Sequence, residues 1–161
     1  MISAHEQAMR DMLRRGSNGA LAGALATVPM SAVMLGAERA GLMGRQPPEV
    51  IAQKALAAAN QEPGKGAVHA TAVAAHFGFG AAAGAAFAWL NGDENSGPRL
   101  VANGLAFGLA VYAVSYAGWI PAMGILPAPS HDRQGRQPSM AAAHAVYGIA
   151  LALLLRSQRD R

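Results

Sequence analysis

The sequence predicts an all-α fold: a single membrane domain over residues 1–161 in which four transmembrane helices form a bundle. The 13 Lys and Arg and the 9 Asp and Glu leave four long intervals without charge, at 16–37, 66–92, 100–130 and 137–155. Each interval is mostly apolar and is long enough to cross the bilayer as a helix, which needs about 20 residues. An ordinary soluble domain carries charge along its whole length and is therefore excluded.

The apolar content comes mostly from alanine, together with 19 glycines, and the mean hydropathy is only +0.19. Weakly apolar helices usually pack against other helices through small side chains, so we expect them to face mostly protein. The absence of cysteine excludes disulfides, thiolate metal sites and thiol catalysis. The basic residues behind the pI near 10.1 flank the apolar runs, so the lipid bilayer, and not nucleic acid, is the expected partner.

The first transmembrane helix is expected at about 18–37, after a short polar and basic interfacial helix within 1–15. Pro29 lies in its middle and removes one backbone hydrogen bond, which predicts a kink. Thr27 or Ser31 is expected to satisfy the carbonyl that Pro29 frees.

A short helix is expected at about 47–60, because two prolines and Glu49 suit a first helical turn. It is too short and too polar to cross a bilayer, so we expect it to lie at the interface. The other transmembrane helices are expected at about 68–90, 100–120 and 139–155, with a polar turn at 91–98 and a proline-rich loop at 121–130. Trp89 and Trp119 fall at helix ends, where an indole prefers the headgroup region.

Four crossings would place both termini on the same side of the membrane. Lys and Arg are divided almost equally between the two sides, so their total does not decide the orientation. Arg10, Arg14 and Arg15 precede the first transmembrane helix, whose flanking charge usually dominates. We therefore expect a multi-pass protein with both termini in the cytoplasm.

An internal repeat is indicated by three pairs of similar segments in the same order. The pairs are 18–23 with 103–108 (NGALAG and NGLAFG), 44–47 with 135–138 (both GRQP) and 75–80 with 143–148 (both Ala-His-x-x-aromatic-Gly). This order predicts tandem duplication of a two-helix hairpin. Each half would cross the membrane twice, so matching residues would lie at similar depth.

Small residues spaced four apart recur in every predicted transmembrane helix and allow helix backbones to approach closely. They are Gly19 and Gly23, Gly80 and Gly84, Gly104 and Gly108, and Gly148 with Ala152. We interpret them as helix-packing residues within the bundle, with homo-oligomer formation as the alternative.

His76 and His144 are the most informative polar residues, because they match in the repeat and lie at similar depth. An ionisable group inside a transmembrane helix is by default a functional-site hypothesis. The pair could ligate a metal or haem, or pass a proton. The alternative is two neutral histidines that lock the packing through hydrogen bonds to Ser115, Tyr112, Tyr116 or a backbone carbonyl.

Tyr112 and Tyr116, one turn apart, complete the candidate ligand-binding set. The alternative is that they are core aromatic residues whose hydroxyls are hydrogen-bonded within the protein. The set does not identify a cofactor. Nothing resembles a Ser-His-Asp set, a phosphate-binding loop or a carboxylate pair, and no acid lies inside a predicted transmembrane helix. We therefore expect no enzyme activity.

Two further groups lie near the outer loops. The first contains His69, His131, Met123 and Met140, which are of types that bind soft metals. Methionines more often fill cores, and ligands must converge in space, so we expect no metal site. The second is Arg136, which we expect to be a solvated charge in a loop. The alternative is that it binds a lipid phosphate or Asp132.

Three strings, HFGFG at 76–80, SYAGWIPAMGILP at 115–127 and MAAAHAVYG at 140–148, resemble a family of small uncharacterised bacterial membrane proteins of the YagU-like type. The resemblance covers the second to fourth transmembrane helices well and the first loosely. It implies a four-helix protein of the bacterial inner (cytoplasmic) membrane with unassigned function, and it supplies no reaction or substrate.

Two function classes remain open. In the first, His76 and His144 form a polar site in the outer half of the bundle for a small ligand, cofactor or proton. In the second, the protein is a structural or accessory subunit that packs against another membrane protein or a second copy of itself.

Overall fold

The protein folds into helices joined by short loops, and the residues that the computed structural model describes (3–59, 62, 64–92 and 97–159) contain no strand. In chain order the elements are α1 (Ala4–Arg39), α2 (Pro47–Ala58), α3 (Lys65–Asn91), α4 (Gly97–Val114), a π-helical turn η1 (Ser115–Trp119), α5 (Ile120–Ala122), a 3-10 turn η2 (Pro129–His131) and α6 (Arg136–Arg159). Within these described ranges, four stretches are long and apolar enough to cross a membrane: Ala4–Arg39, Lys65–Asn91, Gly97–Ala122 and Arg136–Gln158. The predicted all-α class with four apolar helices is confirmed. Half of the predicted turn at 91–98, residues 93–96, lies outside the described residues.

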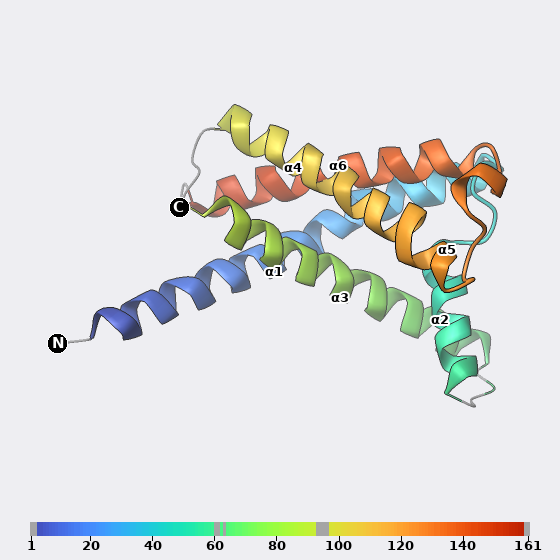
Figure 1. The fold of residues 1–161 in the computed structure, drawn as a ribbon, viewed down its shortest axis with the longest axis horizontal. Coiled ribbons are helices and arrows are strands. Elements are labelled where there is room, and N and C mark those ends of the chain that lie inside the picture. The colour runs from blue at the N-terminus through green and yellow to red at the C-terminus, as the bar shows by residue number, and fades with distance from the viewer. Residues whose placement is uncertain (1–2, 60–61, 63, 93–96, 160–161) are drawn as a thin grey trace.

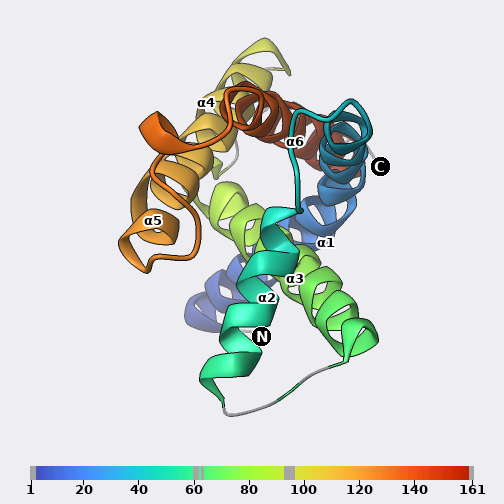
Figure 2. The same ribbon diagram turned by 90° about the vertical axis from the view of Figure 1, so that its right-hand side faces the viewer.

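The long helices form two hairpins. α1 lies along α3, and α4 lies along α6. The hairpins are joined mainly through α1 and α6, whereas α3 and α4 make few contacts (Figures 1 and 2). The start of α1 and the end of α6 lie at one end of the bundle, the terminal end, while α2 and α5 lie at the other, the loop end (Figure 1).

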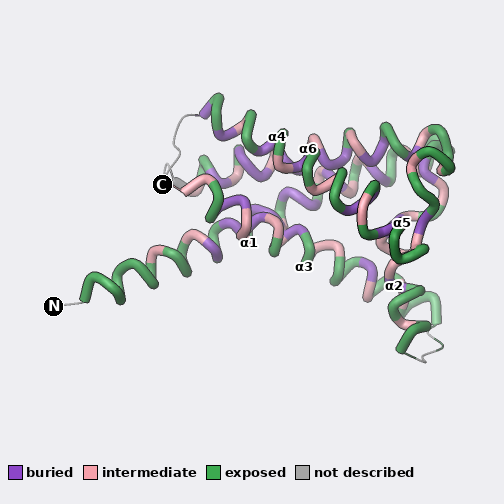
Figure 3. Tube along the Cα trace, in the orientation of Figure 1, coloured by how far each residue is buried: buried purple, intermediate pink, exposed green. Residues whose placement is uncertain are grey.

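α1 is one continuous helix, so the predicted break between an interfacial helix within 1–15 and a transmembrane helix at 18–37 is wrong. A capping box fixes its start, in which the side chains of Ser3 and Glu6 each accept a hydrogen bond from the other's backbone N–H. The first turns of α1 are exposed and extend beyond the other helices (Figure 3).

The helix continues through the expected break because Gly16 is covered by α3. The indole of Trp89 packs on Gly16, where an added Cβ would lie 2.7 Å from the ring. Trp89 Nε1 also donates to the carbonyl of Met12 at 3.1 Å. This tertiary contact outweighs the weak helix propensity of glycine.

α1 also stays helical through Pro29. The hydroxyl of Thr27 donates to the carbonyl of Gly23 at 2.9 Å, so the expectation that it satisfies the carbonyl freed by Pro29 is wrong. Helical side chains reach carbonyls three or four residues earlier, and the carbonyl of Leu25 is therefore beyond the reach of Thr27 and Ser31.

Much apolar surface of the long helices faces outward. Half of the most apolar window of α6 is buried, but only 22% of that of α3. Leu21, Val28 and Phe79 are among the large apolar side chains left exposed, and buried residues concentrate where α1 and α6 meet their neighbours (Figure 3). The expectation that the helices mostly face protein is therefore wrong for a single chain, because α3 and α4 diverge and leave apolar side chains uncovered.

Each hairpin is held by a glycine crossing at which backbones touch. An added Cβ on Gly23 would collide with the backbone of Gly80 on α3. An added Cβ on Gly84 would collide with the backbone of Gly19 and Gly23 on α1. In the second hairpin, an added Cβ on Gly104 or Gly148 would collide with the backbone of the other glycine. An added Cβ on Gly108 would collide with the backbone of His144. Such close approach lets dispersion contacts and shape complementarity hold helices together where no hydrophobic drive exists.

The two crossings have the same pattern but not the register of the repeat in sequence. Gly23 faces Gly80 and Gly84, while Gly108 faces His144 and Gly148. In the packing, Gly80 of the first hairpin therefore takes the place that His144 takes in the second hairpin. The sequence repeat instead pairs His144 with His76, which lies one helical turn before Gly80.

Candidate functional site

A cavity of about 200 Å³ lies between the two hairpins, toward the loop end. α1, α2, α3, α4 with η1, and α6 all contribute to its wall, and no Asp, Glu, Lys or Arg is among the lining residues. Phe79 and Trp119 line the cavity and are also exposed on the outer surface, so they flank its mouth between α3 and α4. The cavity exists because α3 and α4 diverge while α1 and α6 stay in contact.

His76 and His144, from different hairpins, both line this cavity. Of the buried side-chain nitrogen and oxygen atoms in the described part of the chain, only His76 Nε2 and Gln158 Oε1 lack a hydrogen-bond partner. An enclosed polar atom without a protein partner is costly, which marks His76 Nε2 as a candidate contact for a hydrogen-bonding ligand.

His144 has a defined tautomer. Its Nδ1 lies 2.8 Å from the carbonyl oxygen of Met140, and because a carbonyl only accepts, Nδ1 carries the hydrogen. In the neutral ring, Nε2 then has a free lone pair. This hydrogen bond to a backbone carbonyl is one of the alternatives expected from the sequence, and it fixes the ring orientation.

The two candidate tyrosines lie outside the cavity lining. Tyr112 stacks on Tyr116 with ring centroids 5.4 Å apart, and its ring centroid lies 5.7 Å from that of His144. The hydroxyl of Tyr116 donates to Asp132 Oδ2 at 2.9 Å. The structure therefore brings together His76 and His144 from the candidate set, and assigns the tyrosines a supporting position behind His144.

A π-helical turn shapes the wall of the cavity. The N–H of Ile120 donates to the carbonyl of Ser115, five residues earlier, just before Pro121, which has no N–H to donate. The hydroxyl of Ser115 donates to the carbonyl of Val111 at 2.6 Å. This turn places Ser115 and Trp119 in the lining, and turns of this kind are common at functional sites.

Sequence reasoning missed Tyr147 and Thr27, which both line the cavity. Tyr147 lies three residues after His144, on the same helix face, and that spacing could have identified it. Its hydroxyl donates to the carbonyl of Gly80 at 2.6 Å and links α6 to α3. The contribution of α2 through Pro47, Pro48 and Ile51 had no signal in the sequence, since it depends on tertiary packing.

We expect Tyr147→Phe to lower the free energy of unfolding by about 1 kcal/mol, because it removes the buried hydrogen bond between α6 and α3. Denaturation in detergent followed by circular dichroism measures the effect. Ser157→Ala is the control: its hydroxyl is exposed on the same helix, and its loss should change stability by less than about 0.5 kcal/mol. Equal effects of the two substitutions would contradict the assigned role.

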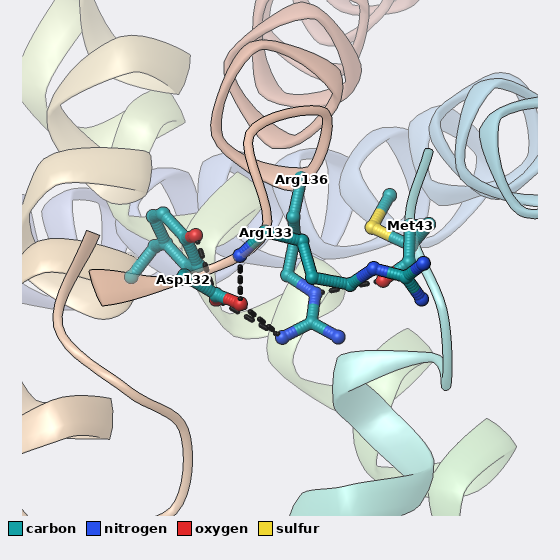
Figure 4. Close-up of polar contacts among 5 residues, drawn as sticks. Met43, Asp132, Arg133 and Arg136 are labelled. Carbon is teal, nitrogen blue, oxygen red and sulfur yellow. Dashed lines mark hydrogen bonds and ion pairs between the residues drawn. The ribbon is translucent and has the colours of Figure 1, made fainter. Parts of the chain in front are cut away.

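A buried polar cluster closes the loop end (Figure 4). Arg136 Nη1 lies 2.7 and 3.0 Å from the two carboxylate oxygens of Asp132, and Arg136 Nε donates to the carbonyl of Met43 at 2.8 Å. The backbone N–H of Arg133 donates to Asp132 at 2.7 Å. The Arg136 and Asp132 side chains are only 9% and 2% exposed, so the expectation of a solvated Arg136 is wrong and Asp132 is its partner.

This cluster also brings the two GRQP segments together. Gly44, with φ of +68°, lies against the guanidinium groups of Arg133 and Arg136, and Gly135 packs on Leu42. An Arg and a buried carboxylate thereby join the loop that follows α1 to the loop that precedes α6. The loop end is fixed across both hairpins.

The residues weighed as metal ligands do not gather. His69 Nδ1 lies 3.3 Å from Glu49 Oε1, His131 Nδ1 lies 2.9 Å from Ser130 Oγ, and Met123 is exposed. Met140 is buried and lines the cavity instead. Within the described ranges, no group of three or more His, Asp or Glu is placed to hold a metal ion.

None of the protein-family models, curated proteins or solved structures compared with the chain matches it.

Proposed function

We propose that this protein is a multi-pass membrane protein that binds a small, uncharged and mostly apolar molecule in the cavity between its hairpins, through His76 and His144. The observation that carries the proposal is the enclosed, unpartnered His76 Nε2 in a cavity that His144 also lines. The lining holds no formal charge to compensate an ion, and burying an uncompensated ion is costly.

The proposed hydrogen bonds follow from the tautomer of His144. Its Nδ1 is occupied by the Met140 carbonyl, so Nε2 is left to accept a hydrogen bond from a ligand O–H or N–H. His76 Nε2 supplies the second polar contact. The remainder of the ligand would lie among Met30, Met34 and Phe79, which are apolar and partly flexible.

The proposed entry route is lateral, from the bilayer. The mouth flanked by Phe79 and Trp119 lies between α3 and α4, on surface made of apolar helices. A lipid-soluble ligand can reach such a mouth without crossing water. The role we propose is binding and not catalysis, because the lining contains no carboxylate and the Ser115 hydroxyl is bonded to a backbone carbonyl.

The membrane placement is part of the proposal. The four apolar helices support a membrane protein, and the arginines before residue 16 favour cytoplasmic termini. α2 would then lie at the opposite interface. The two glycine crossings share a pattern of small residues, as a duplicated hairpin would, but their register differs by one helical turn from that of the sequence repeat. Membership of the YagU-like family and the inner-membrane location rest on the sequence resemblance.

Mass spectrometry of small molecules released from the purified protein, with an absorption spectrum, tests the proposal. We expect an apolar molecule at about one per chain, reduced at least tenfold in His76→Leu/His144→Leu. His69→Leu/His131→Leu is the matched control, since both histidines lie outside the cavity lining. A molecule retained equally by the cavity variant, or no molecule in the wild type, would overturn the proposal.

The accessory-subunit class is favoured by a different observation, the largely uncovered apolar surface of α1, α3 and α4. Another protein chain would cover this surface as well as lipid does. If the protein is an accessory subunit, we expect a particle of more than one chain in mild detergent. A ligand-binding protein needs only the monomer. The mass of the particle, measured by light scattering, separates them.

A further inference from the structure

A second groove, of about 300 Å³, lies among α1, α2 and α3. It adjoins the cavity between the hairpins, with which it shares Met34, Pro48 and His76. Its surface is almost wholly apolar, and two of its lining residues, Leu35 and Val73, are each 44% exposed. The groove therefore opens on the outer surface of two helices that are apolar enough to cross a membrane.

The acidic side chains of the groove lie at one end of it. Glu38 stands in the last turn of α1 and Glu49 in the first turn of α2, both at the loop end. From there the lining follows one face of α1 back to Ser31, a length of about 10 Å at 1.5 Å per residue. A molecule with a polar head at the carboxylates and an apolar tail along the helices has the orientation of a lipid in a membrane leaflet.

The two carboxylates have no basic partner. Glu38 Oε2 accepts a hydrogen bond from Gln46 Nε2 at 2.7 Å, and Glu49 Oε1 lies 3.3 Å from His69 Nδ1. Within the described ranges, neither carboxylate forms an ion pair with a Lys or Arg. The loop end of the groove therefore has negative charge that a cationic group would compensate.

Gln46 joins the two carboxylates into one acceptor set, Glu38, Gln46 and Glu49. Its Nε2 donates both to Glu38 and to the carbonyl of Met34, so its Oε1 is left as an acceptor. Gln46 is also the N-cap residue of α2, where its carbonyl accepts from the backbone N–H of Glu49 at 3.0 Å. Three side chains that accept hydrogen bonds thus lie close together, and a primary ammonium has three N–H donors.

Basic side chains lie next to the acceptor set but outside the groove. Arg39 follows Glu38 and Arg45 precedes Gln46 in the chain, and both are exposed and outside the lining. Arg45 donates to Gln53 from Nη2, which leaves its other N–H groups for a phosphate. Carboxylates inside the groove and guanidinium groups outside it match a zwitterionic headgroup, with the ammonium inside and the phosphate outside.

We propose that the groove binds one membrane phospholipid whose headgroup carries a primary ammonium. The ammonium donates to the acceptor set, the phosphate lies beside Arg39 and Arg45, and one acyl chain follows the groove past Leu35 and Val73. The carboxylates compensate the ammonium, whose removal from water would otherwise be costly. The cavity between the hairpins has no charged lining residue, so the two sites take different molecules.

The inference goes beyond the ligand site between the hairpins and rests only on the membrane placement in the proposed function. Replacing Glu38 and Glu49 should release the phospholipid and leave the cavity ligand bound, because neither residue lines the cavity. If the protein is recovered in the aqueous phase without detergent, the membrane placement itself is wrong. A membrane-embedded protein that binds all phospholipids equally contradicts the groove proposal alone.

Native mass spectrometry of the delipidated protein in mild detergent, with three phospholipids of identical acyl chains, tests the proposal. The probes are phosphatidylethanolamine, which has a primary ammonium, phosphatidylcholine, whose ammonium has no N–H, and phosphatidylglycerol, which has no ammonium. We expect one phosphatidylethanolamine per chain, bound at least tenfold more tightly than either of the others. Glu38→Gln/Glu49→Gln should remove this preference.

Two further variants complete the design. Asp11→Asn/Glu62→Gln is the matched control, because it removes two carboxylates that lie outside the groove lining, and it should keep the preference. Val73→Trp keeps both groove carboxylates but fills the path of the acyl chain, so it should weaken phosphatidylethanolamine binding at least tenfold even if the carboxylate variant does not fold. Equal binding of the three lipids, an unchanged preference in the groove variants, or equally strong binding of free ethanolamine would show that the groove is not a site for this lipid.

Discussion

Replacing Asp132 with alanine is expected to lower the free energy of unfolding by about 3–5 kcal/mol, the largest single effect in this protein. The substitution leaves the guanidinium of Arg136, only 9% exposed, without its carboxylate partner. It also leaves the Tyr116 hydroxyl and the Arg133 backbone N–H without an acceptor. Denaturant titration in detergent, followed by circular dichroism, measures the change.

A double-mutant cycle separates the broken pair from general disruption of the loop. Asp132→Ala/Arg136→Met removes both charges, and we expect it to recover much of the stability lost in Asp132→Ala, because the uncompensated buried charge is gone. If the double variant is less stable than Asp132→Ala by the full cost of a second lesion, the pair is not what holds the loop end.

The same cluster predicts a pH dependence. Burial tends to raise the pKa of Asp132, but hydrogen bonds from the Arg133 backbone and the Tyr116 and Arg136 side chains outweigh it and lower the pKa below 3.8. A lowered pKa means that the group stabilises the fold above its unfolded value and that this stability is lost as pH falls through the folded value. We expect stability to decline below about pH 4, and this slope to be absent in Asp132→Asn.

The second large effect concerns the glycine crossings. Gly148→Ala is expected to destabilise the protein by about 1–3 kcal/mol, because its Cβ would collide with the backbone of Gly104 and no flexible side chain can yield. α4 and α6 would have to separate. Thermal denaturation in detergent and proteolysis of the hairpin report this change.

Gly78→Ala is the matched control for this experiment. Gly78 lies in α3 with no atom within 4 Å of its added Cβ, so alanine gains helix propensity at no steric cost. We expect it to stabilise the protein by up to about 1 kcal/mol. If Gly148→Ala and Gly78→Ala change the stability in the same direction, close backbone contact at the crossing is not important.

The helices were predictable because charge and small residues carry local information. Uncharged intervals located all four apolar helices, and glycines four apart anticipated residues that the structure places at helix crossings. The break before residue 18 was predicted wrongly because the composition changes there from polar and basic to apolar, whereas Trp89 covers Gly16 and the helix runs through this change. That cover comes from another helix and has no local signal.

The site was predictable only in part. His76 and His144 stood out as ionisable groups in apolar helices, but their shared cavity depends on the divergence of α3 and α4. Tyr112 and Tyr116 stack on each other outside the lining, and the Tyr116 hydroxyl donates to Asp132 in the loop before α6, a tertiary contact without a local signal. The burial of Arg136 had an available signal in its spacing of four from Asp132, but the sequence predicted Arg136 in a loop, where solvation is the usual state, whereas it is the first residue of α6.

The central claim is that His76 and His144 face one cavity that holds a small molecule. An experimental density map of the wild-type protein in a lipid nanodisc, at a resolution that shows side chains, tests it most directly. We predict non-protein density between α3 and α4 in contact with both imidazoles, and its absence in His76→Leu/His144→Leu. A map in which α3 and α4 pack together and leave no cavity beside the two histidines would contradict the account.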